Sequence, residues 1–477
     1  MKAMILGIPT IRPQAYRTAA EYAANLRQYG HADTTILVSD DALPGNSSEL
    51  TEGLAHLAAD HPELTIAYLG PQEKAMYLAR LEEKVRSASR LLGRGYGGNR
   101  NWLLLASFGG HLLSVDDDVH PFGILRLKEL PLGGTALRGA FVRPEASEHL
   151  PKVPFDILSS YRSMLGHSVA SVVRHWNDSG QCLTVGSHLQ DSNADLVLNT
   201  TLKPFQPSTV QVVGEGACPR GRIGMVQTYL SGDPDLDTKD LVAEYLLSGD
   251  GEVLKGRPPY RFVLDGFRPC VLDHDYRITC AVLGLDNSGG TIPFIPTRLR
   301  LEDFLLRAYS RQEGIHVGYC AAVQTHLRAM TSRNHIVADA VNEGLATLLK
   351  TMIQAGLCGT GPLQFQFEAR PESPDRGLQA LWASLVEPLN NPESRPGAWR
   401  SSSWELFRSF VWEQVLDLED PGPFIGQKRG QLLDAYADLR TTMELWPRVL
   451  AFAERVPLRP RTLHPTEASH GFGVRAS

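Results

Sequence analysis

The chain has 477 residues, of which 43% are hydrophobic and 21% are charged, as in ordinary globular proteins large enough to bury an extensive core. Its formal charge of −6 gives no general attraction for nucleic acid or anionic lipid, and its six cysteines form no Cys-x-x-Cys pair that would indicate zinc. There is no signal-peptide pattern, and no segment approaches the ~18 apolar residues of a membrane helix. We therefore expect a cytoplasmic protein with no nucleic-acid partner and no integral membrane association.

The first 120 residues alternate strand patterns with helix patterns. Apolar runs that end at Pro, Asp or Gly predict three strands, at 4–8, 34–38 and 64–69. Amphipathic spacing predicts intervening helices, including 16–29 and 73–92. A fourth strand, His111–Val115, leads directly into Asp116. This alternation predicts a mostly parallel α/β sheet flanked by helices, in which ligands bind outside the carboxyl ends of the strands.

The pattern is less regular beyond residue 122. Short apolar runs, including 223–230 and 280–285, fall in a stretch where we expect strands, loops and a few helices, and from about residue 299 the sequence becomes mainly helical, with one candidate strand around 317–323. Proline-rich breaks precede a C-terminal helix with Leu432, Leu439 and Trp446 on one apolar face. We therefore expect an α/β half over 1–125, a second half with a large insertion over 126–370, and a C-terminal helical region and tail over 371–477.

Three consecutive carboxylates follow the fourth strand, at Asp116, Asp117 and Asp118. Mg²⁺ and Mn²⁺ prefer oxygen ligands and are commonly held by one or two carboxylates together with the phosphates of a substrate. The acidic strand end therefore predicts a metal-diphosphate site, with a solvated surface turn as the alternative.

A glycine-rich turn opens into a short helix between Gly93 and Ala106, and this segment carries Arg100. Glycines let the backbone approach a ligand closely, and the N–H groups of a helix N-terminus attract anions. Together with the guanidinium of Arg100 they could hold a diphosphate. The alternative is a flexible turn without a ligand.

The order of these motifs resembles that of GT-A fold glycosyltransferases of the family 2 type. The residues that carry the resemblance are, in chain order, Pro9, Thr10, Asp40, Asp41, Arg100, Asn101, Asp116, Asp117 and Asp118. The resemblance implies a Rossmann-like GT-A sheet whose strand ends bind a nucleotide sugar, with Mn²⁺ or Mg²⁺ as the cofactor.

The resemblance also implies a role for individual side chains. Asp40 or Asp41 would contact the base or the ribose of the donor, and Arg100 would belong to the nucleotide site. Asp116 and Asp118 would bind the metal and the diphosphate as a D-x-D motif. Which of the three neighbouring carboxylates is the main ligand is left open.

A second match lies downstream, where Glu302 and Asp303 precede an expected helix. In inverting family members this Asp is the general base, so Asp303 would deprotonate the acceptor hydroxyl. The alternative is that both acids are first-turn residues favoured by the helix dipole. His326 or His335 could add a metal ligand, as a histidine near the end of the catalytic domain does in some GT-A enzymes.

Two other acidic clusters are interpreted as structural. Asp233, Asp235 and Asp237 have the pattern of a turn that caps a helix, and Asp273–Asp275 that of a loop around a histidine. The long interval between Asp118 and Asp303 indicates an insertion that shapes the acceptor site.

The sequence thus predicts a metal-dependent hexosyl- or N-acetylhexosaminyl-transferase that moves a sugar from a nucleotide-diphosphate donor, by default a UDP-sugar, to a hydroxyl of a soluble small-molecule or natural-product acceptor. Residues 1–125 would bind the donor and 126–370 would form the acceptor side, with inversion if Asp303 is the base. The alternatives are a retaining glycosyltransferase, a nucleotidyltransferase or a non-catalytic nucleotide-binding scaffold. The sequence leaves the acceptor and the oligomeric state open, a homo-oligomer included.

Overall fold

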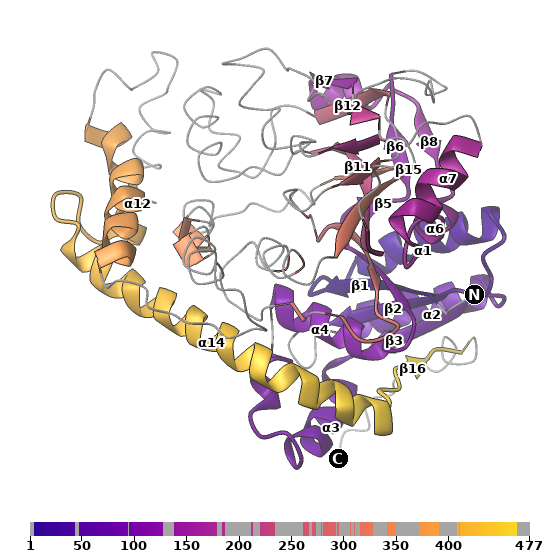
Figure 1. Ribbon diagram of the computed structural model, residues 1–477, viewed down its shortest axis with the longest axis horizontal. Helices are drawn as coiled ribbons and strands as arrows, with labels where there is room; N and C mark the ends of the chain where they lie inside the picture. Colours follow the sequence, from indigo (N-terminus) through magenta and orange to yellow (C-terminus); the bar gives the residue numbers. More distant parts are fainter. Residues whose placement is uncertain are drawn as a thin grey trace.

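The computed structural model confirms the α/β class, with a large mixed sheet flanked by helices (Figure 1). The residues that the structure describes are 4–42, 47–93, 95–126, 138–178, 184–186, 211–212, 220–233, 261–266, 270–272, 278, 280–291, 293–294, 306, 310, 315–327, 341–342, 344–346, 348–349, 372–390, 408–409 and 411–464.

Four parallel strands form the N-terminal half of the sheet, in the order β3-β2-β1-β4. They are β1 (Met4–Thr10), β2 (Thr35–Asp40), β3 (Thr65–Leu69) and β4 (His111–Val115). The helices between them are α1 (Ala15–Gln28), α2 (Ser48–Asp60), α3 (Pro71–Glu82) and α4 (Tyr96–Ala106), with a short η1 helix at Ala88–Arg90. The strands predicted for this half are therefore confirmed.

Side chains that alternate along these strands enter two separate cores, one on each face of the sheet. On β2, for example, Ile36 and Val38 belong to one core and Leu37 to the other. Helices α1 and α2 cover the first face, and α3 and α4 cover the second. Burial on both faces explains why the strands appear in the sequence as continuous apolar runs.

The helix predicted over 73–92 is shorter in the structure, so that prediction was wrong in its extent. Helix α3 ends at Glu82, and the chain then turns through Ser87, which has a φ of +69°. A serine in this left-handed conformation interrupts the helical ladder. Val85 and Ala88 are nonetheless buried in the second core, which is why their spacing resembled that of a helix face.

The second half of the sheet mixes strand directions. Strand β14 (Val282–Asp286) runs antiparallel to both β4 and β11 (Ile223–Gly232), and β11 runs parallel to β15 (His316–His326). The remaining strands of this sheet half are β5 (Val119–His120), β7 (Arg138–Val142), β9 (Thr184–Gly186), β10 (Gln211–Val212), β12 (Arg261–Gly266) and β13 (Cys270–Leu272). Because β14 pairs with β4, one sheet continues across the boundary expected near residue 125.

Smaller elements complete this half. A separate two-stranded sheet pairs β6 with β8, and three helices lie between residues 144 and 178. Their bounds are β6 (Phe122–Ile124), β8 (Lys152–Pro154), α5 (Pro144–Ser147), α6 (Ile157–Arg162) and α7 (Val169–Asp178). Helices α6 and α7 extend the first core alongside α1.

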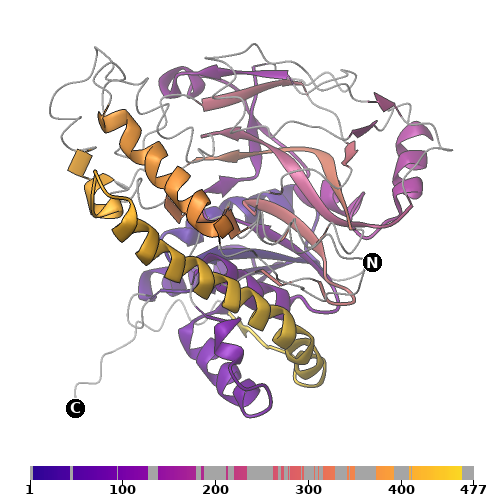
Figure 2. The same cartoon turned by 60° about the vertical axis from the view of Figure 1, so that its left-hand side comes forward.

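The C-terminal region crosses back to the N-terminal half. Helix α12 (Glu372–Asn390) packs along α14 (Gly422–Arg455), and Figure 2 shows the two side by side. The last turns of α14 bury Trp446 and Phe452 in the second core. The chain then forms β16 (Arg461–Thr462), which pairs with the edge of β3 instead of leaving as an extended tail. No helix in the described part of the chain combines the length and apolarity needed to cross a membrane.

Candidate functional site

The strand order places the ends of β1 and β4 at a reversal of the sheet's winding. Successive strands β1, β2 and β3 are added in one direction, whereas β4 lies on the other side of β1. In open α/β sheets such a reversal leaves a crevice at the carboxyl ends of the two central strands, where ligands bind. Thr10 ends β1 here, and Asp116 directly follows β4.

Asp116 is the most open member of the acidic triplet. Its side chain is 31% exposed and accepts a hydrogen bond from Nη2 of Arg100. Arg100 belongs to α4, is nearly fully buried and lies over the ring of Phe294. A buried arginine that is fixed in this way supplies a permanent positive charge beside Asp116.

Asp117 turns back toward the segment after β1. Its carboxylate accepts hydrogen bonds from the hydroxyl of Thr10 and, at 2.8 Å, from Nη1 of Arg12. Its backbone carbonyl accepts a hydrogen bond of 2.6 Å from the hydroxyl of Thr18 on α1. These contacts fasten the middle of the triplet to β1 and α1.

Asp118 lies between two basic side chains. One carboxylate oxygen is 3.0 Å from Nη1 of Arg12, and the other is 3.4 Å from Nε2 of His326, the last residue of β15. The other ring nitrogen of His326, Nδ1, lies 3.1 Å from the carbonyl oxygen of Asp233. A carbonyl only accepts, so Nδ1 carries a proton and Nε2 faces the carboxylate either protonated or with its lone pair.

The neighbours of Asp117 and Asp118 move their pKa values in opposite directions. Burial raises the pKa of Asp117 to about 6, against the lowering effect of Arg12, and the charge of Asp118 raises it further. Burial also acts to raise the pKa of Asp118, but His326 and Arg12 outweigh it and hold that pKa well below its usual range. At neutral pH the carboxyl group of Asp118 is therefore more fully ionised than that of Asp117.

The donor set fits a hard or borderline divalent cation. Carboxylates from one short segment supply oxygen donors, His326 lies beside Asp118, and its Nδ1 donates a proton to a carbonyl, as metal-binding histidines do. Within the described ranges, no three His, Cys, Asp or Glu side chains already converge on one point. A cation at this site would therefore have to draw these side chains closer together, with oxygens from a substrate completing its coordination, as is common for Mg²⁺.

The acidic end of β2 has a different character. One oxygen of the buried Asp40 accepts a hydrogen bond from the backbone N–H of Ala42, and the other accepts from the hydroxyls of Ser47 and Tyr68. Burial raises the pKa of Tyr68, so its hydroxyl keeps the proton that it donates. Asp40 is thus held by three hydrogen bonds from the protein itself.

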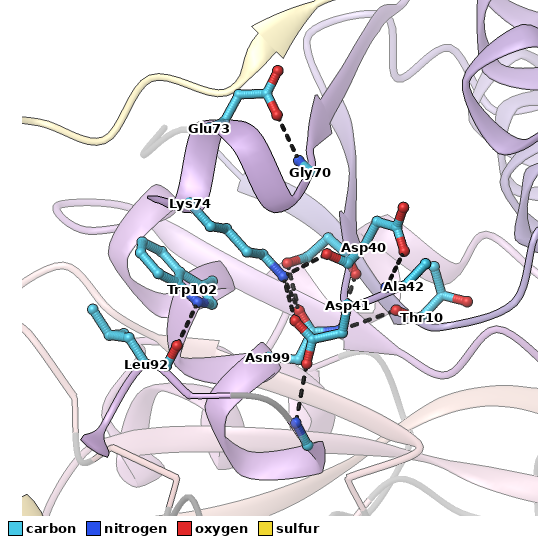
Figure 3. A network of polar contacts seen from close by, with 12 residues as sticks. Thr10, Asp40, Asp41, Ala42, Gly70, Glu73, Lys74, Leu92, Asn99 and Trp102 are labelled. Atoms are coloured by element: carbon cyan, nitrogen blue, oxygen red, sulfur yellow. Dashed lines mark hydrogen bonds and ion pairs between the residues drawn. The ribbon is translucent and has the colours of Figure 1, made fainter. Parts of the chain in front are cut away.

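Asp41 takes part in a second buried network, drawn in Figure 3. Its carboxylate is 2.8 Å from Nζ of Lys74 and accepts a hydrogen bond of 3.0 Å from the backbone N–H of Gly95. Lys74 also donates to the side-chain oxygen of Asn99, at 2.8 Å, and to the carbonyl of Asp40, at 2.9 Å. The glycine-rich turn is thereby joined to the end of β2.

Two glycines of that turn are required by its geometry. Gly95 has a φ of +111° at the start of α4, and a Cβ at Gly98 would lie 2.0 Å from the carbonyl oxygen of Gly93. The close approach brings Asn99 and Arg100 to the strand ends. The neighbouring Asn101 points away from them, because its amide bonds the backbone of Leu91 and Phe294 in the core.

The expected site residues therefore fall into three groups. Thr10, Arg100 and the Asp triplet come together at the β1 and β4 ends, with Pro9 just before Thr10. Asp40, Asp41 and Asn101 have structural contacts. Glu302, Asp303 and His335 lie outside the described residues, as do Asp235, Asp237 and Asp273–Asp275, whereas Asp233 pairs with Arg261 at 2.8 Å.

Two basic residues at the strand ends were not expected from the sequence. Arg12 follows the Pro9–Thr10 motif closely, and that proximity was the available signal. Lys74 is one of several charged residues in α3 and has no distinguishing pattern, so only the tertiary structure reveals its burial. No protein-family model matches this chain, and no curated protein does.

Proposed function

We propose that this protein is a metal-dependent glycosyltransferase of GT-A type, which moves a sugar from a nucleoside-diphosphate donor, most simply UDP-linked, to a hydroxyl of a soluble acceptor. One observation carries the proposal: the acidic triplet after β4 lies at the winding reversal beside Thr10 and Arg12 of the β1 end and beside His326. A site that combines carboxylates with arginines suits a divalent cation and a diphosphate together.

Each side chain has a part in this proposal. Asp116 and Asp118 hold the cation, and His326 adds a nitrogen ligand at the side of Asp118. Mn²⁺ or Mg²⁺, when bound, would stabilise the charge that develops on the departing nucleoside diphosphate. Arg100 keeps Asp116 oriented and contributes positive charge close to the phosphates.

The base of the donor is proposed to lie near the end of β2. Of the two acids there, Asp41 is the better candidate for a base or ribose contact, because Asp40 already accepts three hydrogen bonds within the protein. Asp41 stands beside Gly95, at the start of the turn that leads to Arg100. The proposed donor would therefore extend from the β2 end to the β4 end.

Asp303 is proposed as the general base toward the acceptor hydroxyl, with Glu302 beside it. This part of the proposal depends on the sequence motif, since both residues lie outside the described part of the chain. An Asp303→Asn variant should lose transfer and keep donor binding. Normal transfer by that variant would remove the base assignment and favour a retaining reaction.

The test is a binding screen followed by an activity assay. Thermal unfolding of the purified protein is measured with UDP, GDP, CDP and dTDP, each with and without Mn²⁺, because a ligand of the native state raises the unfolding temperature. A metal-dependent shift with one nucleotide supports the proposal and selects the donors for transfer assays.

Other outcomes would favour other functions. A shift with nucleoside triphosphates, together with release of pyrophosphate, indicates a nucleotidyltransferase. Binding of a nucleoside diphosphate without donor hydrolysis or transfer indicates a scaffold. The absence of any shift contradicts nucleotide-sugar chemistry.

A further inference from the structure

Arg12 and Arg100 neutralise the same acidic triplet in different ways. Arg100 is part of α4, its side chain is 3% exposed, and it pairs with Asp116. Arg12 lies in the segment after β1, its side chain is 33% exposed, and it pairs with both Asp117 and Asp118. Arg100 is therefore a fixed cation, whereas Arg12 can leave its partners without disturbing a helix.

A single nitrogen of Arg12 makes both ion pairs. Nη1 is 2.8 Å from Asp117 and 3.0 Å from Asp118, and within the described part of the chain neither Nη2 nor Nε of Arg12 has a side-chain acceptor. A guanidinium has five N–H donors in a planar fork that suits phosphate oxygens. The partly exposed side chain of Arg12 therefore retains N–H donors that can bind an anionic ligand.

The carboxylates have other supports that remain if Arg12 moves. The hydroxyl of Thr10 still donates to the Asp117 side chain, and the hydroxyl of Thr18 still donates to the Asp117 carbonyl. The backbone N–H of Leu327 donates to the carbonyl of Asp118 at 2.9 Å. The positions of Asp117 and Asp118 are therefore set independently of Arg12.

We propose that Arg12 is a displaceable counter-cation: it neutralises Asp117 and Asp118 in the metal-free protein, yields this place when a divalent cation binds, and then donates to the diphosphate that arrives with the cation. This inference rests on the proposed function and adds a positioning residue to it. It has a thermodynamic consequence. The cation alone competes with Arg12 and binds weakly, whereas the diphosphate gives Arg12 a new partner, so that cation and diphosphate bind cooperatively.

The experiment compares Arg12→Met with Arg12→Lys and with Arg17→Met as the matched control, since Arg17 is a fully exposed arginine on α1. Calorimetry measures the affinity for Mn²⁺ alone, and then the affinities for UDP and for inorganic pyrophosphate at saturating Mn²⁺. Thermal unfolding in the presence of a chelator reports on the metal-free state.

Arg12→Met should bind Mn²⁺ alone about tenfold more tightly than the wild type, because its competitor is gone, and should bind UDP and pyrophosphate about tenfold more weakly, because one charged hydrogen-bond donor is lost. It should unfold at a lower temperature in chelator and recover with Mn²⁺. Arg12→Lys should keep the wild-type Mn²⁺ affinity and bind the diphosphates more weakly, since a lysine lacks the fork. Arg17→Met should match the wild type throughout.

Weaker Mn²⁺ binding by Arg12→Met would overturn the inference and make Arg12 a structural support of the carboxylates. Unchanged UDP and pyrophosphate binding by that variant would also overturn it. A wild type that binds Mn²⁺ with pyrophosphate but not with any nucleotide would contradict the proposed function and leave the role of Arg12 standing. A wild type that binds neither Mn²⁺ nor pyrophosphate would overturn both.

Discussion

The ends of β2 and β4 have the same sequence signature and different structures. Each strand is apolar and runs into consecutive aspartates. At the β2 end, hydroxyls, backbone N–H groups and one buried lysine take up the oxygens of Asp40 and Asp41. At the β4 end, the partners are the hydroxyl of Thr10 and basic side chains from three other parts of the chain, and Asp116 is still 31% exposed.

The comparison indicates that the groups paired with a carboxylate decide whether it supports the fold or forms part of a binding site. Donors that are themselves buried, including the cation of Lys74, hold an acid as part of the fold, and removing one leaves an unpaired polar group. Cations that surround a cluster of acids indicate a site where negative charge has been concentrated at a cost in stability and where another cation can compete. The β2 end therefore has the character of an anchor, to which the proposed donor contact of Asp41 is added, and the β4 end has the character of a cation-binding site.

The largest effect is expected from Asp116→Asn. Loss of this carboxylate should lower the affinity for UDP with Mn²⁺ by more than about 100-fold, since second-shell partners of a metal alone account for roughly 10–100-fold. Stability should fall by about 1–3 kcal/mol, because the buried Arg100 loses a carboxylate that is itself partly exposed. Calorimetry and chemical denaturation measure the two quantities, with the exposed Asp60→Asn as the control. If Asp116→Asn bound UDP with Mn²⁺ as tightly as the wild type, the acids of the β4 end would have no more part in binding than those of the β2 end.

Lys74→Met tests the β2 end. The substitution leaves Asp41 buried without its cation, so the free energy of unfolding should fall by about 3–5 kcal/mol. Urea denaturation measures this loss, with the exposed Lys84→Met as the control. A loss no larger than that of the control would mean that the β2 end is not an anchor.

The pH dependence of stability tests the β4 end in the absence of metal. The pKa of Asp117 is raised to about 6 in the folded protein, so between pH 4 and 6 the folded state binds the proton more tightly than the unfolded state. The contribution of this group to stability is therefore present at low pH and declines by about 2–3 kcal/mol as pH rises through that window. With a chelator present, the stability of the wild type relative to Asp117→Asn should fall by this amount. A relative stability that rises with pH would contradict the assignment.

Thr18→Val should have the smallest effect. It removes the hydrogen bond from α1 to the Asp117 carbonyl, and the free energy of unfolding should fall by about 1 kcal/mol. Thermal denaturation measures it, and the exposed Thr65→Val, on β3, provides the control. Equal stability of the two variants would show that α1 does not help to hold the acidic triplet.

The sequence predicted the parts of the fold that local patterns determine. The apolar runs of β1 to β4 are each terminated by Pro, Asp or Gly, and α1 is followed by Gly30, whose φ of +75° suits glycine. For strands β11, β14 and β15, the apolar runs were recognised from the sequence. Their partners and directions were not, because pairing β4 with β14 joins residues more than 160 positions apart in the chain, and no local pattern encodes such a contact.

The candidate site was predictable to a similar degree. Thr10 and the Asp triplet follow strands, so the strand-end rule brings them together. Their basic partners come from elsewhere: Arg12 from a loop, and His326 from the far end of a strand in the other half of the sheet. Asn101 shows the reverse case, since its motif suggested a ligand contact and its amide instead bonds the core backbone.

Strand β16 has a consequence for how the protein is made. The edge of β3 is covered by residues 461–463, through Arg461 beside Tyr68 and a hydrogen bond of 3.0 Å from the N–H of Leu463 to the carbonyl of Ile66. During synthesis the N-terminal strands emerge almost 400 residues before this cover, and a bare parallel edge is a template for pairing with other chains. A nascent chain, or one truncated before residue 461, should therefore aggregate through β3 and depend on chaperones until residues 461–463 are available to cover that edge.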